Sequence, residues 1–301
     1  MQIHVKIYNM KIKELLEYGR NNLIDKEEPN RLSKMLLKSL LKVDDSYLVI
    51  HSEDDVTEEF QKQFKADIEL LNLGKPIQYI TNNQEFMRMN FYVDENVLIP
   101  QPDTEVLVEE VINICRGKSC ACPKEQNIKI LDLCAGSGAI GISLAKYIKN
   151  SKITMSDISK NALDIANKNA IRNEVENKCS FINSDMFENI KEKFDIIVSN
   201  PPYIKTDVIN TLDKEVQNEP SIALDGGVDG LSFYRIIADE AWKYLNENGI
   251  LAMEIGYDQK DEVFNLLKDT VKYGDIYSKK DLSGKDRVIV CHLHQRLKMN
   301  Y

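Results

Sequence analysis

The part of the chain after about residue 127 alternates short apolar runs with amphipathic segments, and this rhythm limits the possible folds more than any other feature. The first four apolar runs are IKILDLCAG, KITMSDIS, CSFINSD and FDIIVSN, and helical segments such as SGAIGISLAKYIKN and SKNALDIANKNAIRNE separate the first three. Two further apolar runs follow, GILAMEIG and DRVIVCHL. Strands that alternate with helices in this way predict an α/β fold with a doubly wound parallel sheet. Right-handed crossovers then place the functional loops at the carboxyl ends of the strands.

The first 85 residues have a different pattern. Apolar residues recur at spacings of three and four in IKELLEYGRNNL, PNRLSKMLLKSLLKV and VTEEFQKQFKADIELLNLG, which is typical of amphipathic helices. Gly74 follows the third segment, where a helix C-cap is expected. Residues 76–100 change to alternating, β-branched character and suggest a hairpin-like connector. We therefore expect a helical bundle over 1–85, a hairpin-like connector over 86–105 and an α/β domain over 106–301.

Length and charge limit the class of protein. A chain of 301 residues favours two domains, and its 43% apolar share is enough for a core. The net charge of -9 argues against a protein that holds nucleic acid mainly through its phosphates. No apolar stretch reaches the roughly 20 residues of a membrane-spanning helix, and no signal peptide is recognisable, so we expect a cytoplasmic protein. The first convincing helix begins at Met10, and residues 1–9 read as an extension or a misassigned start.

Three of the six cysteines, Cys115, Cys120 and Cys122, lie in the segment CRGKSCACPKEQN and raise the question of a zinc site. Their spacing lacks the paired arrangement of structural zinc sites, and the four histidines are distant in the sequence. His292 and His294 alternate in DRVIVCHLHQ, which fits an exposed strand face as well as a ligand pair. We expect reduced thiols and no metal site.

The first apolar run ends in a glycine-rich turn, LDLCAGSGAIG. Gly136, Gly138 and Gly141 satisfy G-x-G-x-x-G between a strand and a helix, which is the context that this motif requires. Taken alone, the motif fits a dinucleotide equally well. Asp157 ends the second run about twenty residues later, where a carboxylate can accept hydrogen bonds from ribose hydroxyls.

Asp132, which precedes the glycine turn, distinguishes the possible cofactors. A carboxylate there is unfavourable beside a pyrophosphate and favourable beside a cationic sulfonium and its amino-acid head. We therefore interpret the turn as a site for S-adenosylmethionine rather than NAD, with a capping or loop carboxylate as the alternative for Asp132. The candidate cofactor-binding residues are Asp132, Cys134, Ala135, Gly136, Ser137, Gly138, Asp157, Asp185, Met186, Phe187 and Asn200.

The third run ends in INSDMF, where such sheets usually contact the adenine. Asp185 is the candidate for that contact, and Met186 and Phe187 are candidates to pack on the purine ring. The alternative is that these two apolar side chains are ordinary residues of the hydrophobic core.

The fourth run ends in SNPPY, although proline cannot donate to a strand ladder. This break suits the methylation of a planar amide or exocyclic amine, whose delocalised lone pair makes the nitrogen a poor nucleophile. The carbonyls of the Asn200 side chain and the Pro201 backbone can accept its N–H groups and stabilise developing positive charge. Pro201 and Pro202 fix those carbonyls in advance, and Tyr203 offers a flat face to the substrate. A proline-stiffened turn with a capping asparagine is the alternative.

The glycine turn and NPPY together resemble the amino methyltransferases that modify DNA, RNA and protein. Longer stretches narrow the resemblance: GKPIQYI at 74–80, VLIPQPDTEVLVE at 97–109, NEPSIALDGGVDGLSFYRII at 218–237, and then LAMEIG and KDLSGKDRVIV. From about residue 10 onward the chain resembles the glutamine methyltransferases of peptide-chain release factors, the PrmC/HemK family.

This resemblance implies transfer of a methyl group from S-adenosylmethionine to the glutamine side-chain amide in the Gly-Gly-Gln motif of class I release factors. Asn200 to Tyr203 would hold the glutamine, and the helical domain would dock the release factor. The resemblance also implies a Rossmann-like, seven-stranded sheet whose last strand, DRVIVCHL, is antiparallel. We expect a monomer with no membrane partner and no nucleic-acid substrate.

The sequence departs from the family pattern at two positions. Gln101 replaces the usual arginine of IPRPDTE, which removes a positive charge near the mouth of the site. Met186 stands where relatives often carry an aromatic residue, so adenine packing is expected to be weaker or rearranged.

Three other functions compete with this one. A DNA or RNA amino methyltransferase would use the same NPPY loop, but the net charge counts against it. A binding module with a vestigial catalytic domain is disfavoured by the intact NPPY and glycine turn. An NAD-dependent oxidoreductase leaves Asp132 and Asn200 unexplained.

Overall fold

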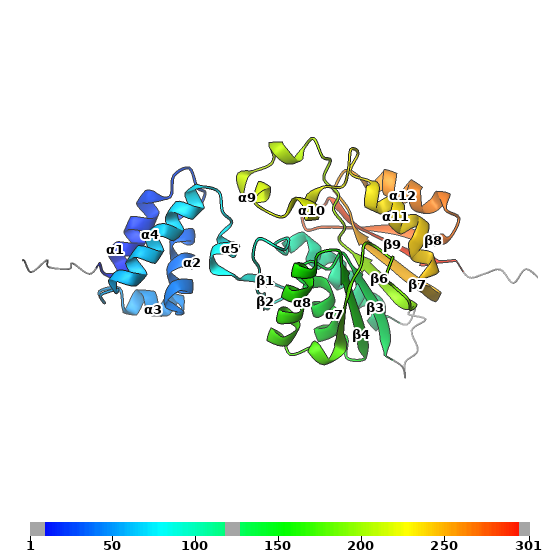
Figure 1. Cartoon of the computed structure of the whole chain (residues 1–301), viewed down its shortest axis with the longest axis horizontal. Helices are drawn as coiled ribbons and strands as arrows, with labels where there is room; N and C mark the ends of the chain where they lie inside the picture. Colours follow the sequence, from blue (N-terminus) through cyan, green and yellow to red (C-terminus); the bar gives the residue numbers. More distant parts are fainter. Residues whose placement is uncertain (1–9, 118–126, 295–301) are drawn as a thin grey trace, which may run out of the picture. The chain divides into compact units, whose positions relative to one another are not determined.

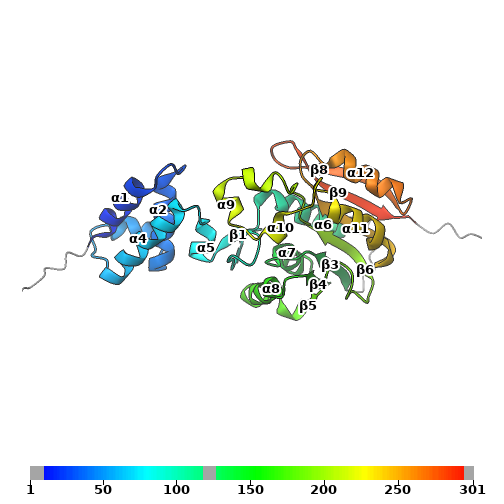
Figure 2. The same ribbon diagram turned by 45° about the horizontal axis from the view of Figure 1, so that its top comes forward.

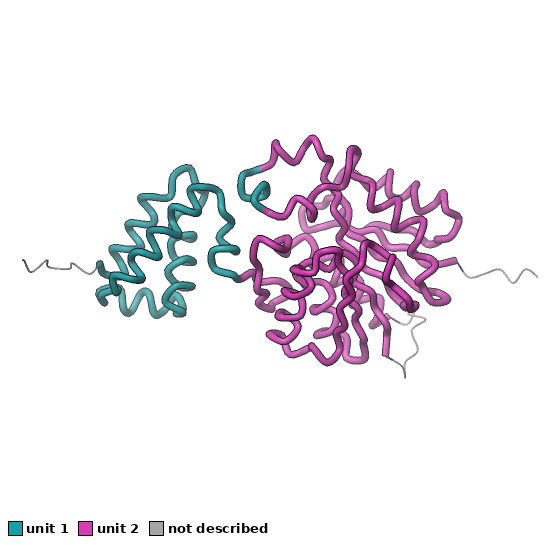
Figure 3. Tube along the Cα trace, in the orientation of Figure 1, with its two compact units in different colours: residues 1–82, 213–218 teal, residues 83–212, 219–301 magenta. Residues whose placement is uncertain are grey.

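The computed structural model describes residues 10–117 and 127–294. The chain divides into two compact units, one formed by residues 1–82 with 213–218 and the other by residues 83–212 with 219–301 (Figure 3). The smaller unit is helical and the larger is an α/β unit (Figure 1). No helix within the described ranges is long and apolar enough to cross a membrane.

The three helices predicted for the smaller unit are confirmed. They are α1 (Ile12–Asn22), α2 (Pro29–Leu41) and α4 (Glu58–Asn72), and their apolar stripes meet in one core. Gly74 ends α4 as predicted, with a φ of 91° that favours glycine.

Three short helices of this unit were not predicted: α3 (Asp45–Ile50), α5 (Ile77–Thr81) and α9 (Lys214–Gln217). The Asp44 side chain caps α3 by accepting a hydrogen bond from the Tyr47 N–H. Helix α9 comes from far along the chain, and Asn218 just after it donates to the Gly74 carbonyl at 3.0 Å. Such a long-range contact leaves no local pattern in the sequence.

The hairpin predicted within residues 76–100 is present but shorter than expected. Strands β1 (Gln84–Phe86) and β2 (Met89–Phe91) pair antiparallel. The first part of the segment 76–100 forms helix α5 instead of a strand. Asn82, in the left-handed conformation, ends this helix.

A seven-stranded sheet forms the centre of the larger unit as described (Figure 1). Its order is β5-β4-β3-β6-β7-β9-β8, and the first five strands of that order are parallel. Strand β9 pairs antiparallel with both neighbours, so the prediction of an antiparallel last strand is confirmed. The strands are β3 (Ile128–Leu133), β4 (Ser151–Asp157), β5 (Cys179–Asn183), β6 (Phe194–Ser199), β7 (Leu245–Glu254), β8 (Tyr273–Lys280) and β9 (Asp286–Leu293).

Helices cover both faces of this sheet, which makes the fold doubly wound (Figure 2). Helices α6 (Glu105–Arg116), α7 (Ala139–Tyr147) and α8 (Lys160–Arg172) share one buried cluster with strand residues such as Ile130 and Val198. Helices α11 (Ser232–Glu240) and α12 (Lys260–Asp269) share the other with Leu131 and Ile197. Consecutive strand residues thus face opposite helical layers.

The remaining elements of this unit are short. They are α10 (Ser221–Leu224) and the 3₁₀ helices Pro102–Thr104, Glu176–Lys178, Ile209–Thr211 and Ala241–Lys243.

The strand order reverses between β3 and β6. Strand β3 continues to β4 on one side, whereas β6 lies on its other side and continues to β7. Ligands of such sheets bind at this switch point, beyond the carboxyl ends of the strands. The glycine turn, Asp157 and Asn200 follow or end β3, β4 and β6, so the topology brings these three sequence motifs to one edge.

Candidate active site

The turn after β3 has a backbone that only a few residue types tolerate. Cys134, Gly136 and Gly138 have φ values of 62°, 53° and 78°. Gly141 meets a further constraint, because a Cβ there would lie 2.8 Å from Met155 Cγ and 2.9 Å from Asp132 Oδ2. Glycine at position 141 therefore lets α7 begin directly against β4 and the Asp132 carboxyl group.

Asp132 is fully buried beneath this turn. Its Oδ2 accepts a hydrogen bond from the Gly141 N–H at 2.8 Å, whereas its Oδ1 is buried without a hydrogen-bond partner among the described residues. Burial raises the pKa of Asp132 to about 7, and the charge of Asp157 adds to the rise. A buried carboxylate oxygen without a partner is costly unless a ligand completes it, so Asp132 fits a cationic ligand group.

Asp157 ends β4 and holds the glycine turn from the other side. Its Oδ2 accepts from the Gly136 N–H and its Oδ1 from the Ser159 N–H, both at 2.8 Å. Burial raises its pKa, and these backbone hydrogen bonds oppose the rise. Each carboxylate oxygen has two lone pairs, so these bonds leave capacity to accept from ribose hydroxyls.

The other residues of the turn are fixed by its surroundings. The Ala135 N–H donates to the Ser156 carbonyl at 3.0 Å, and the Ser137 carbonyl accepts from the buried Asn169 side chain at 3.0 Å. The same Asn169 side chain donates to the Tyr92 carbonyl and accepts from the Tyr92 N–H. A single buried amide thus links the segment after β2 to the glycine turn.

Asp185, Met186 and Phe187, the candidate adenine contacts shortly after β5, differ in exposure. Asp185 is exposed, and Met186 is buried with its sulfur 3.8 Å from Cys134 Sγ. Phe187 is buried, and its ring stacks on Tyr244 with centroids 4.9 Å apart. One face of the Phe187 ring is therefore covered by protein. Adenine packing by Met186 and Phe187 stays a prediction.

The NPPY loop begins where β6 ends. The Asn200 Nδ2 group donates to Thr104 Oγ1 at 3.3 Å, so its Oδ1 is the end of the amide that can accept from a substrate. Pro201 and Pro202 are buried, and Tyr203 is half-buried. Gly226 packs on this loop so closely that a Cβ there would lie 2.7 Å from Tyr203 Cα. The DGG segment of 225–227 is therefore part of the support of NPPY.

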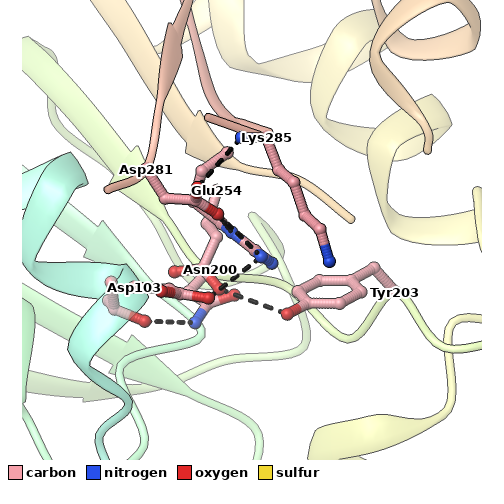
Figure 4. Close-up of polar contacts among 8 residues, drawn as sticks. Asp103, Asn200, Tyr203, Glu254, Asp281 and Lys285 are labelled. Atoms are coloured by element: carbon pink, nitrogen blue, oxygen red, sulfur yellow. Dashed lines mark hydrogen bonds and ion pairs between the residues drawn. The ribbon is translucent and has the colours of Figure 1, made fainter. Parts of the chain in front are cut away.

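A polar network that includes the buried Glu254 and Arg287 lies next to NPPY (Figure 4). The Tyr203 hydroxyl donates to Glu254 Oε1 at 3.2 Å. Arg287 forms ion pairs with Asp103 Oδ2 at 2.9 Å and Asp281 Oδ2 at 3.2 Å. Burial, reinforced by the charge of Glu254, raises the pKa of Tyr203 well above its usual range, so this hydroxyl keeps its proton.

Three residues around NPPY, Thr104, Glu254 and Arg287, were not predicted from the sequence, and neither was Glu219, which joins two of the family stretches. Each lies in one of the stretches that carry the family resemblance, and this placement is the signal that could have found them. Glu219 shows why those stretches go together: its Oε2 accepts from the Ile99 N–H at 2.8 Å and so joins the stretch at 218–237 to the one at 97–109. Arg287 forms an ion pair with Asp103, two residues from Gln101. A guanidinium group is therefore present close to the position at which Gln101 replaces the arginine that is usual in the family.

Most of the cysteine segment, including Cys120 and Cys122, lies outside the described residues. The same is true of residues 1–9. Burial raises the pKa of the Cys115 thiol to about 11. Within the described ranges there is no group of three His, Cys, Asp or Glu side chains arranged to hold a metal ion.

This sheet order, with the glycine turn after β3 and NPPY after β6, is that of the Rossmann-like methyltransferases. Residues 120–281 match the family model described as Methyltransferase small domain, and residues 14–81 match the PrmC N-terminal domain. The chain resembles the hMettl16 catalytic domain, solved in complex with MAT2A 3'UTR hairpin 6, with a TM-score of 0.55 over 80% of this chain and 84% of that one. Their identity is 10%, so this likeness concerns the fold alone.

Two curated relatives define the family more narrowly. The release factor glutamine methyltransferase of Clostridium acetobutylicum is 40% identical over 86% of this chain and 89% of its own length. That of Streptococcus pneumoniae is 37% identical over 93% of this chain and 98% of its own length. The chain belongs to the release factor glutamine methyltransferase family.

Proposed function

We propose that this protein transfers a methyl group from S-adenosylmethionine to the side-chain amide nitrogen of the glutamine in the Gly-Gly-Gln motif of class I release factors. One observation carries the proposal: an NPPY loop stands at the switch point, beside the glycine turn, in a chain that matches release factor glutamine methyltransferases over most of its length. Residues 14–81, which match the PrmC N-terminal domain, would recognise the release factor.

Asp132, Asp157 and the turn from Cys134 to Gly138 would hold the cofactor, with Asp185, Met186 and Phe187 on the adenine side. S-adenosylmethionine would supply an electrophilic methyl carbon on a positively charged sulfonium, and its carbon–sulfur bond would break as the amide nitrogen takes the methyl group, which leaves S-adenosylhomocysteine. The buried Oδ1 of Asp132 offers a negative partner for the cationic groups of that molecule. Asp157 would accept from the ribose hydroxyls, as acids at the end of the second strand do in such sheets.

The NPPY loop would prepare the glutamine amide for attack. Asn200 Oδ1 and the Pro201 carbonyl would accept its two N–H groups, which orients the nitrogen and stabilises the positive charge that develops on it. The Tyr203 ring would support the planar amide, and the two prolines keep the loop in place without a large ordering cost. Alignment of this kind can supply about 7 kcal/mol or more of the barrier reduction, and the amide proton can leave after attack.

The decisive experiment is incubation of the protein with labelled S-adenosylmethionine and purified release factor, followed by peptide mapping. We expect label on the Gly-Gly-Gln glutamine, and none on a release factor in which that glutamine is alanine. A DNA or RNA amino methyltransferase would use the same loop, so ribosomal RNA and DNA are the competing substrates. Label on nucleic acid without label on the release factor would overturn the proposal.

A further inference from the structure

Glu254 is a buried carboxyl group that the chemistry above does not use. It is the last residue of β7 and only 2% exposed. Its Oε1 accepts from the Tyr203 hydroxyl at 3.2 Å, whereas its Oε2 makes no hydrogen bond of ordinary geometry within the described residues. The Tyr234 hydroxyl fixes the backbone at this point by donating to the Glu254 carbonyl at 3.0 Å. An acid in this place is costly, because burial penalises its charge.

The surroundings of Glu254 partly offset this cost. Burial raises the pKa of Glu254 to about 7, and the Thr104 hydroxyl and the Arg287 guanidinium oppose the rise. Arg287 is itself held by Asp103 and Asp281, which come from different parts of the chain (Figure 4). The groups that act on this carboxyl group thus come from three parts of the chain: Thr104 from a 3₁₀ helix, Tyr203 from the NPPY loop and Arg287 from β9.

Two of the groups around this carboxyl belong to, or hold, the NPPY loop. Tyr203 is the last residue of the motif and donates to Glu254 directly. Thr104 accepts from the Asn200 amide, the first residue of the motif, and interacts with the same carboxyl group. One end of NPPY is thus bonded to a side chain of the neighbouring strand β7, and the other end is bonded to Thr104, whose hydroxyl favours the charged form of that side chain.

We propose that Glu254 is a positioning residue for methyl transfer, which holds Tyr203 through its hydroxyl and Asn200 through Thr104. This inference rests on the proposed role of Asn200 to Tyr203 in binding the glutamine amide. A hydrophobic side chain of similar size would be cheaper to bury, and the acid is explained by its direct contact with Tyr203 and by its interaction with Thr104, which holds Asn200.

A double-mutant cycle tests this proposal. Glu254→Gln keeps the shape but removes the charge and places an N–H group beside Arg287 or Thr104, and Tyr203→Phe removes only the hydroxyl. With release factor as substrate, we expect each single change to lower kcat about tenfold, because Tyr203→Phe removes a buried hydrogen bond to a charged group and Glu254→Gln removes the charge that strengthens it. The Kd for S-adenosylmethionine should change by about twofold or less, since the cofactor side is untouched. The double variant should lose clearly less than the about hundredfold product of the single losses, because both changes act on the same Tyr203–Glu254 contact.

A matched pair elsewhere in the same unit provides the control. The Tyr277 hydroxyl donates to Glu110 Oε1 at 2.8 Å, on β8 and α6. Tyr277→Phe and Glu110→Gln make the same chemical changes there, and we expect kcat close to that of the unaltered protein. A general effect of losing such a pair would lower kcat in the control as well, and would contradict the proposal.

The remaining outcomes are also decisive. Full kcat in Glu254→Gln, or losses that multiply in the double variant, would overturn the positioning role. If Glu254→Gln does not fold, Tyr203→Phe and Thr104→Val replace it, because both leave the carboxyl group in place and remove its contacts; full kcat in both would overturn the role. If the unaltered protein does not methylate release factor at all, the proposed function fails instead, so the two failures are distinguishable.

Discussion

A buried carboxyl group lies on each side of the switch point, Asp132 on β3 and Glu254 on β7, and the two are held in different ways. Asp132 and Glu254 are almost without exposure, each has one oxygen without a hydrogen-bond partner among the described residues, and burial raises the pKa of both to about 7. Asp132 is held by a backbone N–H of α7, nine residues further along the chain. Glu254 is held by the side chain of Tyr203, 51 residues earlier in the chain.

On the proposed function, the carboxyl group on the cofactor side is held by local backbone, whereas the one on the substrate side is held by a distant side chain. A backbone N–H at the start of a helix is fixed by the helix itself, so the Asp132 contact needs little more than the glycine turn. The Tyr203–Glu254 contact needs β6, β7 and the loops around Arg287 to be in place. We therefore expect changes on the cofactor side to affect binding and changes on the substrate side to affect turnover.

Asn200→Ala should give the largest effect. The variant loses the side-chain acceptor for the substrate amide, and loss of one such group typically lowers kcat about 100- to 1,000-fold. The Kd for S-adenosylmethionine, measured by calorimetry, should rise much less. Equal losses in kcat and in cofactor affinity would mean that Asn200 serves mainly the cofactor, and the division between the two sides would fail.

Asp132→Asn should give the opposite signature. The change keeps the size of the side chain but removes the charge that we propose faces the cationic cofactor, so we expect the Kd for S-adenosylmethionine to rise about 10- to 100-fold. At saturating cofactor, kcat should fall by less than the affinity does. A variant that binds the cofactor normally and loses only kcat would show that Asp132 acts on the reaction rather than on binding.

The same division determines what the sequence could predict. The parallel strands, the glycine turn and the position of Asn200 follow from local patterns of apolar and turn-forming residues, and all were found. The family resemblance implied seven strands, but apolar runs located only six, because β8 is an edge strand in which Tyr273 alone is buried. Glu254 and Arg287 could not be assigned roles, since their partners lie far away in the chain and no local spacing records such contacts.

The affinity for S-adenosylmethionine should depend on pH through Asp132. Its pKa is raised to about 7, so the group is neutral in the free protein below that pH and charged above it. Because the cofactor is cationic, affinity should rise with pH, by up to about tenfold per unit below pH 7, and then level off. Calorimetric titrations between about pH 5 and about pH 8 measure this, and Asp132→Asn should flatten the curve. An unchanged slope in the variant would assign the titration to another group, with Asp157 the nearest candidate.

Glu219 is a further buried carboxyl group, and its effect on stability can be measured without cofactor or release factor. Its Oε2 accepts from the Ile99 N–H, and burial raises its pKa to about 7, above the value of 4.5 expected in the unfolded chain. A raised pKa in the folded state means that its contribution to stability is fully present below about pH 4.5 and is lost as pH rises through 7. The unfolding free energy of the unaltered protein should therefore fall between about pH 5 and pH 8 relative to Glu219→Gln, by roughly 1–3 kcal/mol. Denaturant titrations at the two pH values measure the difference, and parallel curves for the two proteins would show that Glu219 stays charged in the fold.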